Sequence, residues 1–206
     1  MESFITDKKY ILRRYIMSNS QTKRTKTVVI TAFFAAIIYL GIQAFRVPLP
    51  AGFGTPFVHF GHIFIMLAII CLGGKMATVA GVIGLLIFDL VNGYIHAIPN
   101  VFVSTVINCL LVGTAHAAML RKANGNMKSE HKYAIFASVL YGISNTVIDF
   151  VWNLIQLMIV GNSFRVAFMT ELTSIPATII NAVFTVIGIA VLYIPVITAY
   201  RRIIKG

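Results

Sequence analysis

Six runs of mostly apolar residues with almost no charge occupy most of this 206-residue chain and limit its fold more than any other feature. A helix needs about 20 apolar residues to cross a bilayer, or fewer where the membrane is locally thinner. A water-soluble domain has about a quarter of its residues charged, whereas here the fraction is 11%. The runs occupy residues 27–45, 58–72, 76–91, 99–120, 133–160 and 174–200. We therefore expect an all-α integral membrane protein with six transmembrane helices.

The basic residues lie between the apolar runs and predict the orientation of the chain. Of the 17 Lys and Arg residues, only Arg46 and Arg165 fall in the intervals assigned to the outer side. Positive charge gathers on the cytoplasmic side of membrane proteins, so we expect both termini in the cytoplasm of a multi-pass protein in a prokaryotic-type plasma membrane. Charges scattered in this way do not form a nucleic-acid-binding face. We divide the chain into a basic cytoplasmic segment, 1–26, and a six-helix transmembrane domain, 27–206.

The segment between the first two runs is apolar but rich in proline and glycine. Its sequence, VPLPAGFGTPF, cannot form a regular helix, because proline lacks the backbone donor and fixes its φ angle. It is also too apolar for an ordinary solvated loop. We therefore expect an ordered outer loop that folds back over the protein.

Polar side chains recur at helical spacing inside the apolar runs, where an ionisable group costs several kcal/mol unless it is paired or solvated. The fifth run carries four of them at i, i+4, i+8 and i+11, which places them on one face, and the fourth run carries three at i, i+4 and i+8. A further group ends the third run, and a histidine lies where the outer loop enters the second. In chain order the candidate binding residues are His59, Asp89, Asn92, Tyr94, Asn100, Ser104, Asn108, Asn145, Asp149, Trp152, Asn153 and Gln156.

On the predicted orientation nearly all of these side chains lie in the outer half of the bilayer, which indicates a pocket that opens outward beneath the loop. The group around Asp149 and Trp152 favours a ligand, because an aromatic ring beside a carboxylate and two amides suits a flat heterocycle with donor groups. Any single Asn can equally join two helices by hydrogen bonds, and Asp89 can be a structural partner of a neighbouring helix. His59 and His62 have no clear third ligand nearby, so we expect no metal site.

Small residues four apart occur in the first and third runs. Ala32 and Ala36 form one such pair, and the third run contains two more, Ala77 with Gly81 and Ala80 with Gly84. Small residues let helices approach closely in lipid. These pairs therefore predict either close packing within the bundle or a smooth face for a partner helix.

Four short segments in the first half of the chain point to a family. They read R-x-P-L-P from Arg46, V-H-F-G from Val58, L-G-G-K from Leu72 and D-L-V-N-G-Y from Asp89. Together with the basic amino terminus and the six-run layout, they resemble the S-components, the substrate-binding subunits, of energy-coupling factor (ECF) vitamin transporters. The resemblance covers nearly the whole chain in layout, and it is closest to the hydroxymethylpyrimidine or pyridoxine-type group.

The resemblance implies a subunit that is not an enzyme and that binds a vitamin tightly on the outer side of the membrane. It implies docking through Ala32 and Ala36 onto a transmembrane coupling protein that carries two ATPases. ATP is then used by the partner subunits, and no cofactor is expected in this chain, which has no GxxxxGK[ST] segment. The outer loop would act as the gate, with Arg46, Pro48, Pro50, Gly52, Phe53 and Gly54 as gating residues.

The residues leave the vitamin and two other function classes open. Asp89 and Asp149 favour a ligand with amino or hydroxyl donors, such as an aminopyrimidine or pyridoxamine, while pantothenate, folate and riboflavin remain alternatives. A membrane-embedded enzyme would use the same two aspartates as an acid pair, but the chain has no recognisable catalytic constellation. A channel or secondary carrier often has inverted repeats, and we find none.

Overall fold

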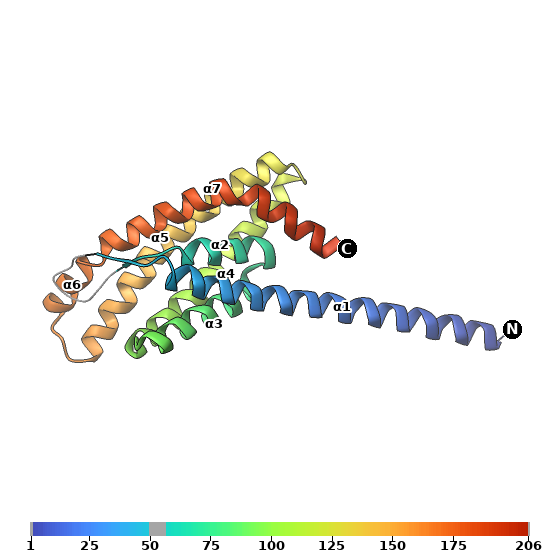
Figure 1. The fold of residues 1–206 in the computed structure, drawn as a ribbon, viewed down its shortest axis with the longest axis horizontal. Helices are drawn as coiled ribbons and strands as arrows, with labels where there is room; N and C mark the ends of the chain where they lie inside the picture. The colour runs from blue at the N-terminus through green and yellow to red at the C-terminus, as the bar shows by residue number, and fades with distance from the viewer. Residues whose placement is uncertain (1, 50–56, 206) are drawn as a thin grey trace.

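The computed structural model describes residues 2–49 and 57–205 and consists almost entirely of helices (Figure 1). The elements in chain order are α1 (Glu2–Gln43), β1 (Val47–Pro48), β2 (Phe57–Val58), α2 (Gly61–Leu72), α3 (Gly74–Asn92), the short 3-10 helix η1 (Ile95–Ala97), α4 (Ile98–Ala123), α5 (Met127–Ile159), α6 (Phe164–Leu172) and α7 (Ile175–Lys205).

Five helical stretches within the described residues are long and apolar enough to cross a membrane, rather than the six predicted. They are Gln21–Gln43, Gly74–Asn92, Ile95–Ala123, Met127–Ile159 and Ile175–Ile204. The second predicted span is the 12-residue helix α2. This helix contacts α1, α3, α4, α5 and α7, and its residues 65–71 are all buried. A helix that is apolar all round and shielded by its neighbours does not have to match the thickness of the lipid.

The start of the second predicted run and the segment before the last run also differ from the prediction. Val58 belongs to β2, which pairs antiparallel with β1 through Val47–Val58 and Pro48–Phe57. Residues 161–173, which lie between the fifth and sixth predicted runs, contain α6. This helix begins after Ser163, whose hydroxyl accepts a hydrogen bond from the Val166 amide at 3.4 Å, a typical N-terminal cap.

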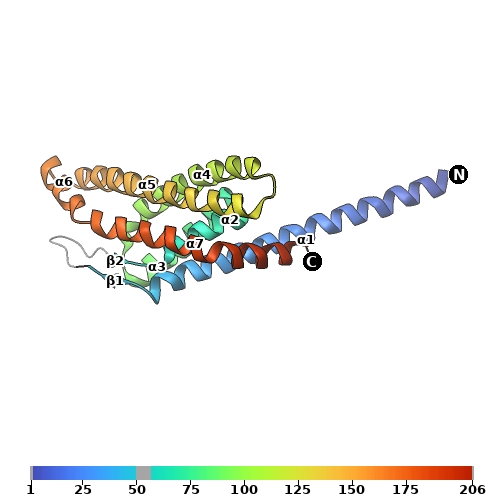
Figure 2. The ribbon, with the colours of Figure 1, turned by 90° about the horizontal axis from the view of Figure 1, so that it is seen from above.

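The bundle has two distinct ends (Figures 1 and 2). One end, here called the basic end, holds the α2–α3 and α4–α5 turns and the carboxyl terminus, and α1 projects beyond it. The other end, here called the α6 end, holds β1, β2, η1 and α6. The two longest packed helices, α5 and α7, run side by side between the two ends. The basic residues of the two turns and of the end of α7 lie at the basic end, whereas Arg46 and Arg165 lie toward the α6 end.

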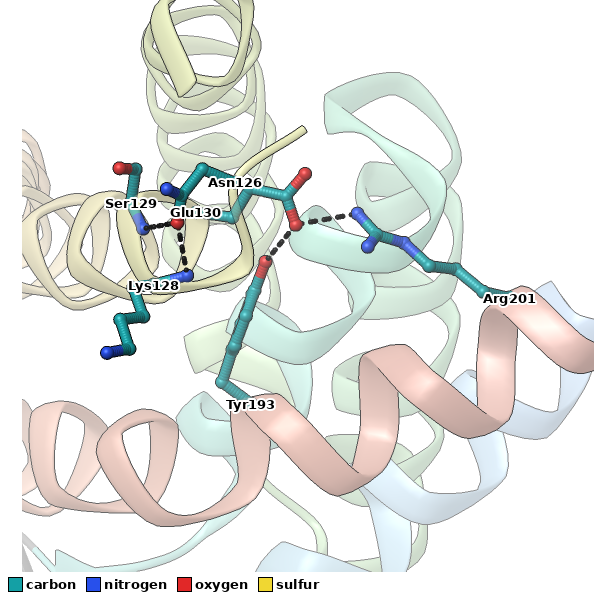
Figure 3. A network of polar contacts seen from close by, with 6 residues as sticks. All are labelled: Asn126, Lys128, Ser129, Glu130, Tyr193 and Arg201. Carbon is teal, nitrogen blue, oxygen red and sulfur yellow. Dashed lines mark hydrogen bonds and ion pairs between the residues drawn. The ribbon is translucent and has the colours of Figure 1, made fainter. Parts of the chain in front are cut away.

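A buried ionic network joins α5 to α7 at the basic end (Figure 3). The Glu130 carboxylate accepts a hydrogen bond from Arg201 at 2.7 Å and one from the Tyr193 hydroxyl at 3.2 Å. Asn126 caps α5 by accepting bonds from the amides of Lys128 and Ser129. Helix α5 therefore begins at Met127, six residues before the predicted start of the fifth span, because the cap and the network stabilise a first turn that is not apolar.

The small-residue pairs of the first and third predicted spans have different environments. Ala77, Ala80, Gly81 and Gly84 of α3 are all buried, so these two pairs pack within the bundle. A Cβ atom on Gly84 would lie 2.6 Å from the Ala35 carbonyl oxygen of α1. In contrast, Ala32 and Ala36 of α1 are exposed on the surface of the bundle.

This close approach of α1 and α3 predicts the effect of enlarging Gly84. The Gly84→Ala variant should lower the free energy of unfolding by about 1–3 kcal/mol, because the new methyl group overpacks the contact. Thermal unfolding in detergent measures this, with Ile83→Ala on the exposed face of the same helix as the control. An unchanged melting temperature for Gly84→Ala would show that the two helices are not this close.

Candidate functional site

A polar cavity lies inside the bundle toward the α6 end. Each of the seven α-helices contributes to its lining. Its volume is about 440 Å³, within the range of pockets that hold drug-sized molecules. The residues that line it are Ile42, Phe57, His59, His62, Leu85, Phe88, Asp89, Ala97, Asn100, Val101, Ser104, Thr105, Tyr141, Asn145, Asp149, Asn153, Thr170, Glu171, Thr173, Ser174, Ala177, Thr178 and Asn181. The lining therefore combines apolar and aromatic side chains with carboxylates, amides and hydroxyls.

A directed chain of hydrogen bonds leads from the bundle interior to Asp149. The Ser144 hydroxyl donates to Asn108 Oδ1 at 2.5 Å, and Asn108 Nδ2 donates to Asn145 Oδ1 at 3.1 Å. Asn145 Nδ2 then donates to Asp149 Oδ2 at 2.6 Å, and Ser104 and Asn100 line the cavity beside this carboxylate. Each amide is oriented by the preceding one, so the network holds the Asp149 carboxylate in place as an acceptor at the cavity wall.

Glu171 supplies a second carboxylate, from α6. The Ser174 hydroxyl lies 3.4 Å from Glu171 Oε2, and the Asn153 side chain lies close to this carboxylate. Burial raises the pKa of Glu171, while the hydrogen bonds from Asn153 and Ser174 act in the opposite direction. Glu171 is close enough to Asp149 for the two carboxylates to repel each other, so the cavity has a wall that accepts hydrogen bonds.

Asp89 is buried in the cavity lining, and one of its carboxylate oxygens accepts no hydrogen bond from the described residues. Its side chain is 5% exposed, and its Oδ2 atom has no hydrogen-bond partner among the described residues. The same holds for Asn100 Oδ1, which is also buried in the lining. Buried acceptors without a partner are unfavourable, so these two atoms indicate a position where a donor from a bound molecule belongs.

An aromatic cluster forms a different wall of the cavity. The rings of Phe57, Phe88 and Tyr94 lie with centroids 5.8, 5.9 and 6.2 Å apart, and the Arg46 guanidinium lies 5.6 Å from the Phe88 ring centroid. These rings come from β2, the end of α3 and the turn after it. Ring edges and faces at such spacing suit the packing of a flat ligand.

His59 and His62 are paired in the lining, with ring centroids 4.7 Å apart. The His59 Nδ1 atom accepts a hydrogen bond from the Gly61 amide at 3.1 Å. Burial, and next the neighbouring His62, lower the pKa of His59 well below its usual value, so the ring is neutral. Within the described residues, no group of three or more His, Cys, Asp or Glu side chains is placed to hold a metal ion.

Asn181 of α7 attaches the strand β2 and the start of α2 to the bundle. Its Oδ1 atom accepts a hydrogen bond from the His59 amide at 2.8 Å, and its Nδ2 atom donates to the Phe57 carbonyl at 3.2 Å. One side chain therefore holds the backbone on both sides of Val58.

Removing this attachment should loosen the aromatic wall. The Asn181→Ala variant leaves the buried His59 amide unpaired, which costs about 1–3 kcal/mol, and should speed amide hydrogen exchange in residues 57–61. Hydrogen-exchange mass spectrometry measures this, with Ile180→Ala on the exposed side of α7 as the control. Wild-type exchange rates in this segment would contradict the role given to Asn181.

The structure brings together seven of the twelve binding residues proposed from the sequence. Those that line the cavity are His59, Asp89, Asn100, Ser104, Asn145, Asp149 and Asn153. The other five lie beside it. Asn108 belongs to the hydrogen-bond chain and Tyr94 to the aromatic cluster, Asn92 donates to Gln43 and to the Phe88 carbonyl, and Gln156 donates to the His96 carbonyl. Trp152 lies between α4 and α5 beside apolar residues.

Several lining residues were not among the sequence-based candidates. They are Phe57, His62, Phe88, Tyr141, Thr170, Glu171 and Ser174. Glu171 is the one for which the sequence does contain a signal. Ser163 followed by FRVAFMTEL has the pattern of a capped short helix, and this helix carries the acid. Of the proposed gating residues, Arg46 lies beside the aromatic cluster and Pro48 belongs to β1. The other four lie outside the described residues: Pro50, Gly52, Phe53 and Gly54.

Comparison with known proteins gives one family match and two structural likenesses. The family model described as "ECF-type riboflavin transporter, S component" matches residues 22–202. The structure of ThiT from Listeria monocytogenes is similar with a TM-score of 0.59 and 16% identity, over 88% of this chain and 98% of that one. The S-component for biotin from an ECF-type ABC transporter is similar with a TM-score of 0.56 and 18% identity, over 84% and 93%. At these identities the likeness shows the fold alone. No curated protein sequence matches the chain.

Proposed function

Since the chain belongs to the family of S-components of ECF-type riboflavin transporters, we propose that its polar cavity is the binding site for the transported vitamin. The family consists of membrane-embedded transport subunits and not of enzymes, which argues against Asp89 and Asp149 as a catalytic acid pair. The observation that carries the proposal is the cavity itself, which combines an aromatic wall, a carboxylate wall and two buried acceptors without partners.

The charges of the cavity restrict the class of vitamin. The described lining contains Asp89, Asp149 and Glu171 but no Lys or Arg. An anionic vitamin such as pantothenate or folate would meet repulsion there with no compensating cation. A neutral or cationic vitamin with several N–H or O–H donors fits this lining.

Riboflavin is the first candidate. It is the vitamin named in the family's description, it is neutral, and it joins a flat tricyclic ring to a chain with four hydroxyl groups. The ring suits the aromatic cluster, and the hydroxyls are the donors that the carboxylates accept. A cavity of about 440 Å³ also has room for a ligand larger than a single ring.

A hydroxymethylpyrimidine or pyridoxine-type vitamin is the second candidate. The specific observation in its favour is that Asp149 and Glu171 line the same cavity, because two carboxylates in one site suit an amino or ammonium group. Such a ligand fills less of the cavity.

The sidedness and the partners complete the proposal. We propose six membrane-crossing segments with α2 as the shielded sixth, the α6 end on the outer side and both termini in the cytoplasm. We also propose the loop from Arg46 to Val58 as the gate of the cavity. The exposed pair Ala32 and Ala36 forms the docking face for a transmembrane coupling protein. Two ATPase subunits bound to that protein use ATP, and this chain needs no cofactor.

Native mass spectrometry of the protein purified in mild detergent tests the proposal. We expect one vitamin to be retained per chain, with the mass of riboflavin, and to be lost from an Asp149→Ala variant. A retained pyrimidine or pyridoxine-type mass would select the second candidate. A protein that retains no vitamin and binds none on addition would contradict the function proposed for the cavity.

A further inference from the structure

The two walls of the cavity come from different parts of the bundle. The aromatic cluster belongs to β2 and to the α3 end with its following turn, where Asp89 also lies, whereas the other two lining carboxylates, Asp149 and Glu171, belong to α5 and α6. Helix α4 packs between α3 and α5, and its side chains Asn100 and Ser104 line the cavity between the two walls. A ligand that contacts both walls must therefore have two chemically different parts.

Building on the proposed function, we infer that Asp149 and Glu171 form the specificity subsite for a donor-bearing arm of the vitamin, separate from the wall that holds its ring. For riboflavin, that arm is the hydroxylated chain.

The hydrogen bonds around the pair explain why it accepts donors. Asn145 donates to one oxygen of Asp149. The Ser174 hydroxyl donates to the Glu171 backbone carbonyl at 2.8 Å and lies 3.4 Å from Glu171 Oε2, and Asn153 lies close to the same carboxylate. The surrounding side chains are thus already arranged as donors toward the carboxylates, which stabilises both as acceptors. Asp149 and Glu171 line the same cavity, so together they offer several acceptor oxygens to hydroxyl or amino donors, and they repel anions.

Asp89 provides the second, independent indication of a ligand. It is more than nine-tenths buried, and its free Oδ2 atom lies in the lining next to Phe88, on the aromatic side. A ring N–H is the donor that such an acceptor requires. The free acceptor at the ring wall and the carboxylate pair at the opposite wall therefore recognise different parts of one molecule.

A matched pair of flavins tests the separation of the two subsites. Lumiflavin has the riboflavin ring with a methyl group in place of the hydroxylated chain. Binding to the purified full-length protein is followed by quenching of flavin fluorescence. We expect wild-type protein to bind riboflavin at least about tenfold more tightly than lumiflavin.

The variant Glu171→Gln should remove most of this preference, because it weakens riboflavin binding about five- to tenfold and leaves lumiflavin binding nearly unchanged. Glu171→Ala serves as a second variant, and thermal unfolding confirms that both are folded. The control Glu130→Gln makes the same chemical change in a buried carboxylate at the basic end, and it should leave the ratio of the two affinities at the wild-type value.

Each outcome separates this inference from the proposed function. Equal affinity of wild-type protein for the two flavins, or an equal loss of both in Glu171→Gln, would overturn the arm subsite while leaving a vitamin site in place. Binding of neither flavin by wild-type protein would overturn the assignment of riboflavin and, with it, the subsite.

Discussion

Vitamin binding is expected to weaken by about 2–6 kcal/mol when Asp149 and Asn153 are both replaced by alanine. The estimate assumes about 1–3 kcal/mol for each buried hydrogen-bonding group that loses its partner. Asp149 receives the hydrogen-bond chain that starts at Ser144, and Asn153 supports Glu171. The double change therefore disturbs both carboxylates of the acceptor wall. Isothermal titration calorimetry with riboflavin measures the loss.

The control for this prediction lies on the same helix. Ile155→Ala removes an exposed side chain of α5 that faces away from the cavity and should bind riboflavin as the wild type does. If the purified double variant is folded and binds with wild-type affinity, these two residues do not belong to the site.

Vitamin uptake into cells is expected to be lost when Ala32 or Ala36 is replaced by phenylalanine, while the affinity for the vitamin stays nearly unchanged. Both alanines are exposed on α1, one turn apart, and neither lines the cavity. A smooth face lets a partner helix approach closely, and a large ring prevents this contact. Uptake of radiolabelled vitamin and binding to the purified variant measure the two effects separately.

Ala117→Phe is the matched control, because Ala117 is an exposed alanine of another apolar helix, α4. This variant should take up the vitamin normally. Equal losses of uptake and binding in Ala32→Phe would indicate a disturbed fold rather than a lost partner contact, and normal uptake would exclude this face from docking.

The family and the long helices could be predicted from the sequence because both depend on local patterns. Apolar runs bounded by basic residues locate α3, α4 and α7 to within about five residues and the carboxyl ends of α1 and α5 to within two, whereas α1 and α5 begin before their runs, at Glu2 and Met127. The length and position of α2 could not be predicted in the same way. Its 12 residues are as apolar as a true span, and only the contacts with five neighbouring helices reveal that it is enclosed.

The cavity was only partly predictable for a similar reason. Helical spacing identified the polar faces of α4 and α5, and these faces do meet at the cavity. Spacing does not reveal which amide points at which neighbour, so Asn108 was predicted as a ligand contact although it orients Asn145. Glu171 was missed because its helix has only nine residues. A helix this short after a polar segment has too little periodicity to be distinguished from a loop in the sequence. Trp152 shares the helix of Asp149 but points between α4 and α5 toward apolar side chains.

An experimental structure of the protein with its vitamin tests the central claim most directly. We predict that the vitamin occupies the cavity near the α6 end, with its ring against Phe57 and Phe88 and its donor groups at Asp149 and Glu171. A vitamin bound elsewhere, for example in the apolar groove between α5 and α7 around Gly142 and Ala182, would contradict the account.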